Sequence, residues 1–198
     1  MSMNFQIVRY NFISQKVRKP LRIVMIADLH NQVYGLENTD LLTAIDTEQP
    51  DIILLPGDMI VCRKSERKNN RVTADTIRKM TEIAPVYYSY GNHERGLLEC
   101  VRETDGIWQE YSQHLKGAHH LHMLVNAHEF LEPWNVCLYG LDLRARITNG
   151  SSRNRSGKRC LPACLDDAAR SLQCAACTQS GLFPDILYTA SRLDRVRA

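Results

Sequence analysis

The stretch PDIILLPGDMI, residues 50–60, decides the fold that we predict for this chain of 198 residues. Its apolar run Ile52–Leu55 has the length and composition of a short strand buried on both faces. Pro50 ends the helix expected before it, and Gly57 allows a tight turn directly after it. That turn carries Asp58, so the stretch predicts a buried strand with a carboxylate at its carboxyl end.

Two other stretches repeat this arrangement. The strand predicted at 21–27 (LRIVMIA) is followed by Asp28-Leu29-His30, and the strand predicted at 86–90 (VYYSY) is followed by Gly91-Asn92-His93-Glu94. Apolar spacing predicts helices at 38–48, at 72–83 and through Trp108, Tyr111 and Leu115, with further strands at 121–125, 129–131 and 136–141. This alternation of strands and helices predicts a layered α/β fold.

The three polar clusters are expected to meet at one edge of the sheet, because the carboxyl ends of parallel strands line the ligand crevice of such folds. Two aspartates, two histidines and an asparagine would then lie together. Carboxylate and imidazole donors suit Mn, Fe or Zn. A carboxylate such as Asp58 can bridge two ions about 3.5–4 Å apart, which together grip a phosphate and activate a water. Each cluster is weak alone, and the three in this order are specific.

With these motifs the chain resembles the calcineurin-like metallophosphoesterase superfamily, in particular its bacterial single-domain members. The resemblance covers residues 21–143, from D-x-H through G-D and G-N-H-[DE] to the stretch VCLYGLDL at 136–143. It implies the N-terminal half of a layered β-sandwich with flanking helices, in a domain at residues 1–142. It also implies a metal-dependent hydrolase of phosphomonoesters or phosphodiesters.

The resemblance assigns a role to each site residue. It implies that Asp28, His30 and Asp58 bind the first of two divalent ions (Mn, Fe or Zn), and that Asp58 bridges to the second. Asn92 would bind that second ion, and His93 would stabilise or protonate the phosphoryl transition state. The implied reaction is in-line attack by a metal-bound hydroxide on phosphorus.

Arg95 is the candidate substrate-binding residue, because it follows the GNHE cluster closely enough to contact a phosphate. A surface ion pair with Glu94 or Glu99 explains it equally well. His119-His120-Leu121-His122 resembles a metal cluster, but alternate residues of a strand face opposite ways. We interpret it as a surface turn that enters a strand.

The last 56 residues depart from the family pattern. No histidine follows His128, whereas the family has two later histidine motifs, so we expect an incomplete metal shell, weak manganese binding and impaired hydrolysis. Residues 143–198 lack helical or strand periodicity and are expected to be a disordered or out-of-frame tail. One permitted back-translation of 176–198, read one base later, yields both missing histidine motifs, which predicts a one-base shift near Leu143–Ala145.

Charge and cysteine divide at the same boundary. Residues 1–142 hold 15 Lys and Arg against 18 Asp and Glu, and residues 143–198 hold 10 against 4. The overall charge of +3 is therefore no strong nucleic-acid signal. The alternative function is a non-enzymatic one, in which the four tail cysteines (Cys160, Cys164, Cys174 and Cys177) bind zinc and the basic tail binds nucleic acid.

Composition and the start of the chain set the remaining expectations. With 44% hydrophobic and 24% charged residues, the chain suits one soluble domain. No apolar run reaches the ~20 residues of a membrane span, and the start MSMNFQIVRYNFISQKVRK lacks a secretory apolar stretch, so we expect a cytoplasmic protein. Its expected partner is a phosphorylated small molecule or nucleotide, and its oligomeric state is left open.

Overall fold

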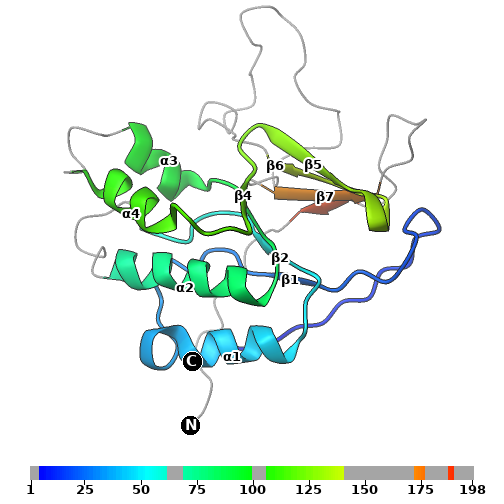
Figure 1. Ribbon diagram of the computed structural model, residues 1–198, viewed down its shortest axis with the longest axis horizontal. Coiled ribbons are helices and arrows are strands. Elements are labelled where there is room, and N and C mark those ends of the chain that lie inside the picture. The colour runs from blue at the N-terminus through cyan, green and yellow to red at the C-terminus, as the bar shows by residue number, and fades with distance from the viewer. Residues whose placement is uncertain (1–4, 62–68, 100–105, 141–171, 177–186, 190–198) are drawn as a thin grey trace, which may run out of the picture.

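Four short parallel strands form the central sheet of the computed structural model, which describes residues 5–61, 69–99, 106–140, 172–176 and 187–189 (Figure 1). The strands are β1 (Ile23–Met25), β2 (Ile52–Leu55), β3 (Val86–Tyr88) and β4 (Leu121–Met123), and they lie side by side in that order. Leu54 of β2 pairs with Met25 on one side and Tyr87 on the other. The carboxyl ends of the strands therefore share one edge of the sheet.

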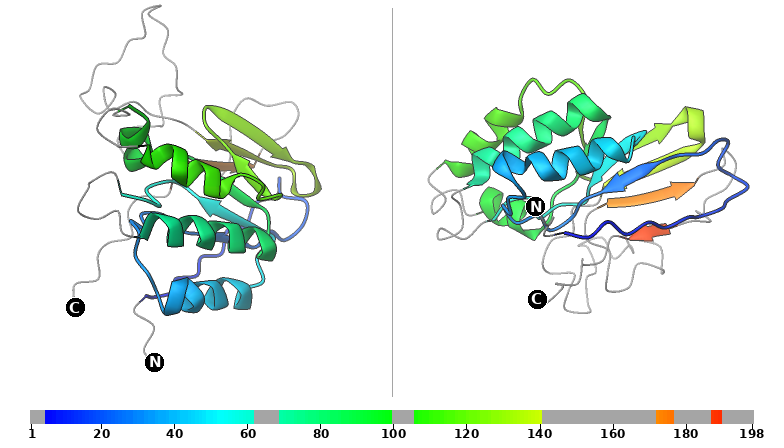
Figure 2. Two further views of the ribbon diagram at one scale, coloured as in Figure 1. Left: turned by 60° about the vertical axis from the view of Figure 1, so that its left-hand side comes forward. Right: turned by 90° about the horizontal axis from the view of Figure 1, so that it is seen from below.

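Four helices cover one face of this sheet (Figures 1 and 2). They are α1 (Thr39–Thr47), preceded by the short 3-10 turn η1 (Leu36–Asn38), and α2 (Asn70–Ile83), α3 (Asn92–Glu99) and α4 (Ile107–Leu115). Across the described residues, every helix is too short or too polar to span a bilayer. The predicted helices at 38–48 and 72–83 and the helix through Trp108 are confirmed.

A second, antiparallel sheet covers the other face. It consists of β5 (Ala127–Leu131), β6 (Val136–Gly140), β7 (Leu172–Ala176) and β8 (Leu187–Thr189), paired in sequence order, and the 3-10 turn η3 (Glu132–Trp134) joins its first two strands. Helices, parallel sheet and antiparallel sheet thus form three layers (Figure 2). The predicted layered α/β fold is confirmed.

The side chains of β2 alternate between two hydrophobic cores. Ile53 and Leu55 belong to the core beneath the helices, whereas Ile52 and Leu54 belong to the core between the two sheets. All four are at most 1% exposed. A strand that is buried on both faces needs a continuous apolar run, which explains why IILL consists of consecutive apolar residues.

The N-terminal segment is attached to the second sheet. The backbone N–H of Arg18 donates to the carbonyl of Trp134 (3.1 Å), and the indole N–H of Trp134 donates to the carbonyl of Pro20 (3.1 Å). Val17 and Leu21 pack against the core between the sheets. The chain therefore closes a contact between its first 21 residues and the turn η3.

Two features differ from the sequence-based expectation. Residues 92–99, where the apolar spacing predicts no helix, form the helix α3. The tail was expected to be irregular, but within it β7 pairs with β6 and β8 pairs with β7. The remainder of the tail lies outside the described residues, as do the boundary at 142–143, the proposed frame shift and Cys160, Cys164 and Cys177.

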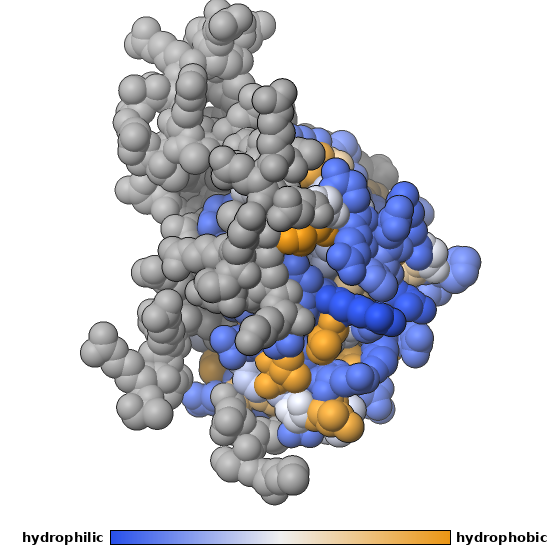
Figure 3. Space-filling model, turned by 90° about the vertical axis from the view of Figure 1, so that its left-hand side faces the viewer, coloured by the Kyte–Doolittle hydropathy of each residue, from blue (hydrophilic) through white to orange (hydrophobic). Residues whose placement is uncertain are grey.

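Figure 3 shows the side of the molecule that lies at the left in Figure 1, and the described part of this side is mainly hydrophilic. Hydrophobic residues occur there in small, separate groups rather than in one broad patch (Figure 3). Scattered apolar residues of this kind are normal on a protein surface.

Candidate metal centre

The loops that follow β1 and β2 are joined by their backbones. Beyond the last strand residues, the N–H of Asp28 donates to the carbonyl of Gly57 (3.2 Å) and that of His30 donates to the carbonyl of Asp58 (3.0 Å). The N–H of Asn31 then donates to the carbonyl of Met59 (3.0 Å). These bonds continue the parallel pairing into the loops, so the motifs D-x-H and G-D lie against each other.

The backbone at these loops is strained. Asp28, His30, Asn31 and Asp58 have φ values of 54°, 50°, 58° and 53°, in the left-handed region that side chains other than glycine rarely adopt. Each such residue costs on the order of 1–3 kcal/mol and persists only when its surroundings hold it. Strained residues are common at functional sites, and four of the nine non-glycine residues with positive φ in the described chain lie at the carboxyl ends of β1 and β2.

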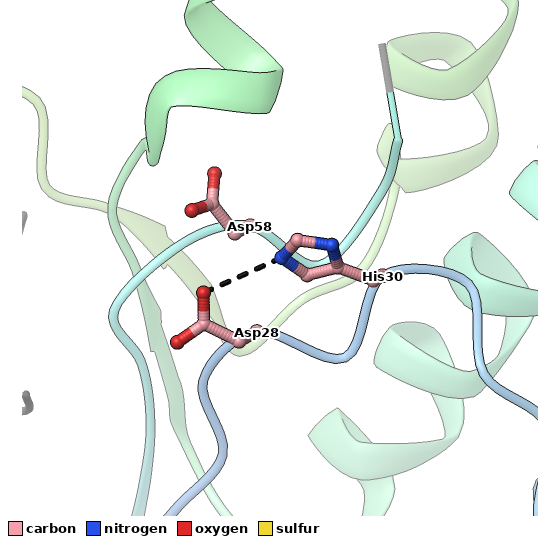
Figure 4. Close-up of side chains that lie close together, drawn as sticks. All are labelled: Asp28, His30 and Asp58. Atoms are coloured by element: carbon pink, nitrogen blue, oxygen red, sulfur yellow. Dashed lines mark hydrogen bonds and ion pairs between the residues drawn. The ribbon is translucent and has the colours of Figure 1, made fainter. Parts of the chain in front are cut away.

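Side chains from the two loops converge on one point (Figure 4). Asp28, His30 and Asp58 each offer one ligand atom, and these atoms all lie within 4.8 Å of one another. His30 Nε2 lies 3.3 Å from Asp28 Oδ1. The side chains of Asp28 and His30 are about one-third exposed, whereas Asp58 is buried. Two carboxylates and an imidazole at this spacing, open to solvent on one side, fit a divalent cation.

Helix α3 brings the third motif to the same place. The backbone N–H of His93 donates to Asp58 Oδ1 (2.8 Å), so the carboxylate lies at the positive amino end of the helix. The rings of His93 and His30 meet edge to face, with 4.7 Å between their centroids. The structure therefore brings His93 beside the three ligand candidates. Asn92 is exposed at the first residue of α3.

Two glycines allow these loops to touch. Gly57 has φ +116°, and a Cβ placed there would collide with the backbone nitrogen of Gly91. A Cβ placed on Gly91 would collide with the carboxylate of Asp58. The glycines of the motifs G-D and G-N-H-E are thus needed for close packing of two backbones, as their turn chemistry predicts.

The histidine cluster at 119–122 does not belong to the group of three ligand candidates. Arg95 is half-buried on α3 near Tyr90. Burial raises the pKa of Tyr90, and the positive charge of Arg95 partly offsets that rise. His119 and His120 are exposed in the turn before β4, as the sequence predicts. His122 pairs instead with Glu129 of β5, with 3.0 Å between Nδ1 and Oε2.

Sequence reasoning missed the role of Glu94, which it considered only as an ion-pair partner for Arg95. Glu94 is fully buried and accepts hydrogen bonds from the backbone of the Asp58 turn. Burial raises the pKa of Glu94, as does the nearby carboxylate of Asp58, while hydrogen bonds from Tyr88 and the backbone act in the opposite direction. The signal for this role in the sequence was the acidic residue at the end of the motif G-N-H-E, which directly follows a buried strand.

Comparisons with known proteins agree with this geometry. The Metallophos family model, described as calcineurin-like phosphoesterase, matches residues 21–161. The chain is similar to phosphodiesterase YaeI of Escherichia coli (strain K12), with 32% identity over 94 residues. That alignment covers 46% of this chain and 34% of YaeI, so the chain matches about a third of the length of this relative. No solved structure matches the chain significantly.

Proposed function

The chain belongs to the calcineurin-like phosphoesterase family, and on that premise we propose that it is a metal-dependent phosphoester hydrolase. The observation that carries the proposal is the convergence of Asp28, His30 and Asp58, whose ligand atoms lie within 4.8 Å of one another. His93 lies next to them across an edge-to-face contact with His30.

The donor set supports a centre for Mn, Fe or Zn. In this proposal Asp28, His30 and Asp58 hold a first ion, and Asp58 and Asn92 hold a second. When bound, such ions polarise a phosphoester and lower the pKa of the water that attacks phosphorus. Asp58 would contribute to both ions, and the N–H of His93 orients its carboxylate at the amino end of α3.

The chain's own residues orient the substrate and move the proton. We assign His93 as the catalytic residue that donates a proton to the leaving oxygen, because its ring lies against that of His30 beside the centre. Arg95 is assigned to the phosphate oxygens, from its position three residues after Asn92. The substrate class is a phosphorylated small molecule or nucleotide in the cytoplasm, and the name of the relative YaeI favours a phosphodiester.

The missing histidines limit this activity. No histidine follows His128, so each ion has only part of the ligand set that the family pattern implies. The loss of outer-shell partners alone typically costs 10–100-fold in metal affinity, and the loss of ligands costs more. We therefore expect the 198-residue chain to bind manganese weakly and to hydrolyse a generic aryl phosphodiester slowly.

Manganese titration of the apoprotein, followed by electron paramagnetic resonance or calorimetry, tests the proposal. Asp58→Asn removes a ligand charge at the centre and is expected to weaken Mn²⁺ binding at least 10-fold. Asp46→Asn is the matched control, because Asp46 is exposed on α1, and it should bind like the wild type. Equal Mn²⁺ affinity in Asp58→Asn and the wild type would refute the assigned centre. Rapid phosphodiester hydrolysis by the wild type that Asp58→Asn abolishes would refute the expectation that the activity is impaired.

A further inference from the structure

A buried carboxylate lies directly behind the candidate metal centre. Glu94 is 0% exposed, and its two oxygens accept four short hydrogen bonds of 2.8–2.9 Å, besides a longer one of 3.5 Å from the backbone N–H of Ile60. Oε2 accepts the backbone N–H groups of Asp58 and Gly91, and Oε1 accepts the N–H of Met59 and the hydroxyl of Tyr88. One side chain of α3 thus binds the turn after β2 and the turn after β3 together.

The form of this contact suits a carboxylate better than any other side chain. Asp58 and Met59 are consecutive, and with Asp58 left-handed at φ 53° their N–H groups both face Glu94. Successive N–H groups in such a turn form a concave anion-binding nest. Four close donors around two oxygens need a group that only accepts hydrogen bonds. An amide does not suit this place, because its N–H₂ group would face other donors.

Two tyrosines extend the contact to α4. The single hydroxyl proton of Tyr88 goes to Glu94, so the Tyr88 oxygen accepts the hydroxyl of Tyr111, 3.1 Å away. Both tyrosines are buried, with exposed fractions of 0% and 2%. Hydrogen bonds in a chain of this kind polarise one another inside a low-dielectric core.

We propose that Glu94 is a positioning residue, which holds Asp58 in its strained conformation and so directs the Asp58 carboxylate at Asp28 and His30. Tyr88 supports it from the hydrophobic core through its hydrogen bond to Glu94. The proposal rests on the proposed function, because the position of Asp58 matters as that of a metal ligand. The hydrogen bonds of Glu94 themselves exist without metal. The positioning role explains why the motif G-N-H-E ends in an acidic residue that is buried and that contacts Asp58 through its backbone N–H.

Amide hydrogen exchange by NMR on the metal-free, full-length chain tests the proposal. In Glu94→Gln, the amides of Asp58, Met59 and Gly91 are expected to exchange at least 10-fold faster. The amides of Ile26 and Ile53, which donate to backbone carbonyls within the sheet, should stay within two-fold of the wild type. Unchanged exchange at the three turn amides would overturn the proposal, and so would equal acceleration at all five, since that is general destabilisation.

If Glu94→Gln does not fold, Tyr88→Phe is the variant that tests the positioning role. It keeps the carboxylate and removes one of the four close donors, so exchange at Asp58 and Met59 should rise about three-fold, and no rise would overturn the proposal. Tyr111→Phe is the matched control, because it leaves all four short bonds to Glu94 and should change neither amide beyond two-fold. Manganese affinity of Glu94→Gln should also fall about 10–100-fold. A wild type that binds no manganese refutes the proposed function, while the exchange data still decide the positioning role.

Discussion

Strained residues at the candidate centre are held by contacts from other loops rather than by their own neighbours in sequence. The turn at Asp58 depends on Glu94, 36 residues away, and on backbone contact between Gly57 and Gly91. The free energy stored in these conformations comes from the packed structure around them. Substitutions at the glycines therefore test how tightly the two loops must approach.

Gly57→Ala is expected to destabilise the protein far more than Gly117→Ala. Both glycines have positive φ, +116° and +85°, but a Cβ at Gly57 meets the backbone of Gly91, whereas a Cβ at Gly117 meets nothing within 4 Å. The control should lose about 1 kcal/mol, the usual cost of a left-handed side chain. Urea denaturation of both variants measures the difference, and equal losses would show that the approach of the two loops is not tight.

The ligand candidates could be predicted from the sequence, but their positioning could not. Asp28, His30 and Asp58 each follow a recognisable buried strand, and parallel strands bring their carboxyl ends together. The structure does place their ligand atoms within one small region. The contact of Glu94 with the Asp58 turn depends on where α3 enters the core, which no local spacing encodes.

At the scale of elements, α3 is the helix that local pattern did not reveal. It has only eight residues, with Gly96 inside it, and Leu97 is its fully buried apolar residue. Its amino end is satisfied by Asp58 from another loop rather than by its own capping residue. Short helices are stabilised mainly by tertiary packing, which explains why the local apolar spacing predicts no helix at these residues.

Leu97→Ala is expected to cost about 2–5 kcal/mol in the free energy of unfolding, because it leaves a cavity in the core beneath the helices. Leu98→Ala is the neighbouring control, since Leu98 is only half-buried, and it should cost clearly less. Chemical denaturation followed by circular dichroism gives both values. Similar losses in the two variants would contradict the packing described for α3.

At the scale of the whole molecule, polar side chains join the two sheets. The hydroxyl of Tyr87 in β3 donates to Glu129 Oε1 in β5 (3.1 Å), and the ring of His122 in β4 stacks on that of Tyr87 at 4.7 Å. Burial raises the pKa of Tyr87, and the charge of Glu129 adds to that rise. Burial also raises the pKa values of Tyr88 and Tyr111 in the helix-side core.

These tyrosines predict a loss of stability at alkaline pH. Tyrosines of the unfolded chain ionise near pH 10. Above that pH the unfolded chain has released tyrosine protons that the folded chain still keeps. The free energy of unfolding therefore falls as the pH rises, by about 1.4 kcal/mol per pH unit for each such tyrosine. Urea denaturation at pH 9, 10 and 11 measures the slope. Tyr111→Phe should reduce it, whereas Tyr10→Phe, at a residue 70% exposed, should not.

The layered architecture was predictable because its central strands are short, apolar and followed by motifs at one edge. IILL is buried on both faces, and its alternate residues enter two different cores. The strands β7 and β8 were not predictable, since their residues show no alternation, and they join the sheet through backbone pairing of β7 to β6 and of β8 to β7. Backbone pairing of this kind leaves little trace in side-chain pattern.

The attachment of the N-terminal segment to the turn η3 has a consequence for synthesis on the ribosome. Pro20 and Trp134, which share a hydrogen bond, are 114 residues apart. At 5–20 residues per second, translation needs roughly 6 to 23 seconds to supply the partner after the segment itself is made. Val17 and Leu21 remain without the second sheet during that interval. The nascent chain therefore presents an apolar segment to chaperones until its 134th residue has emerged.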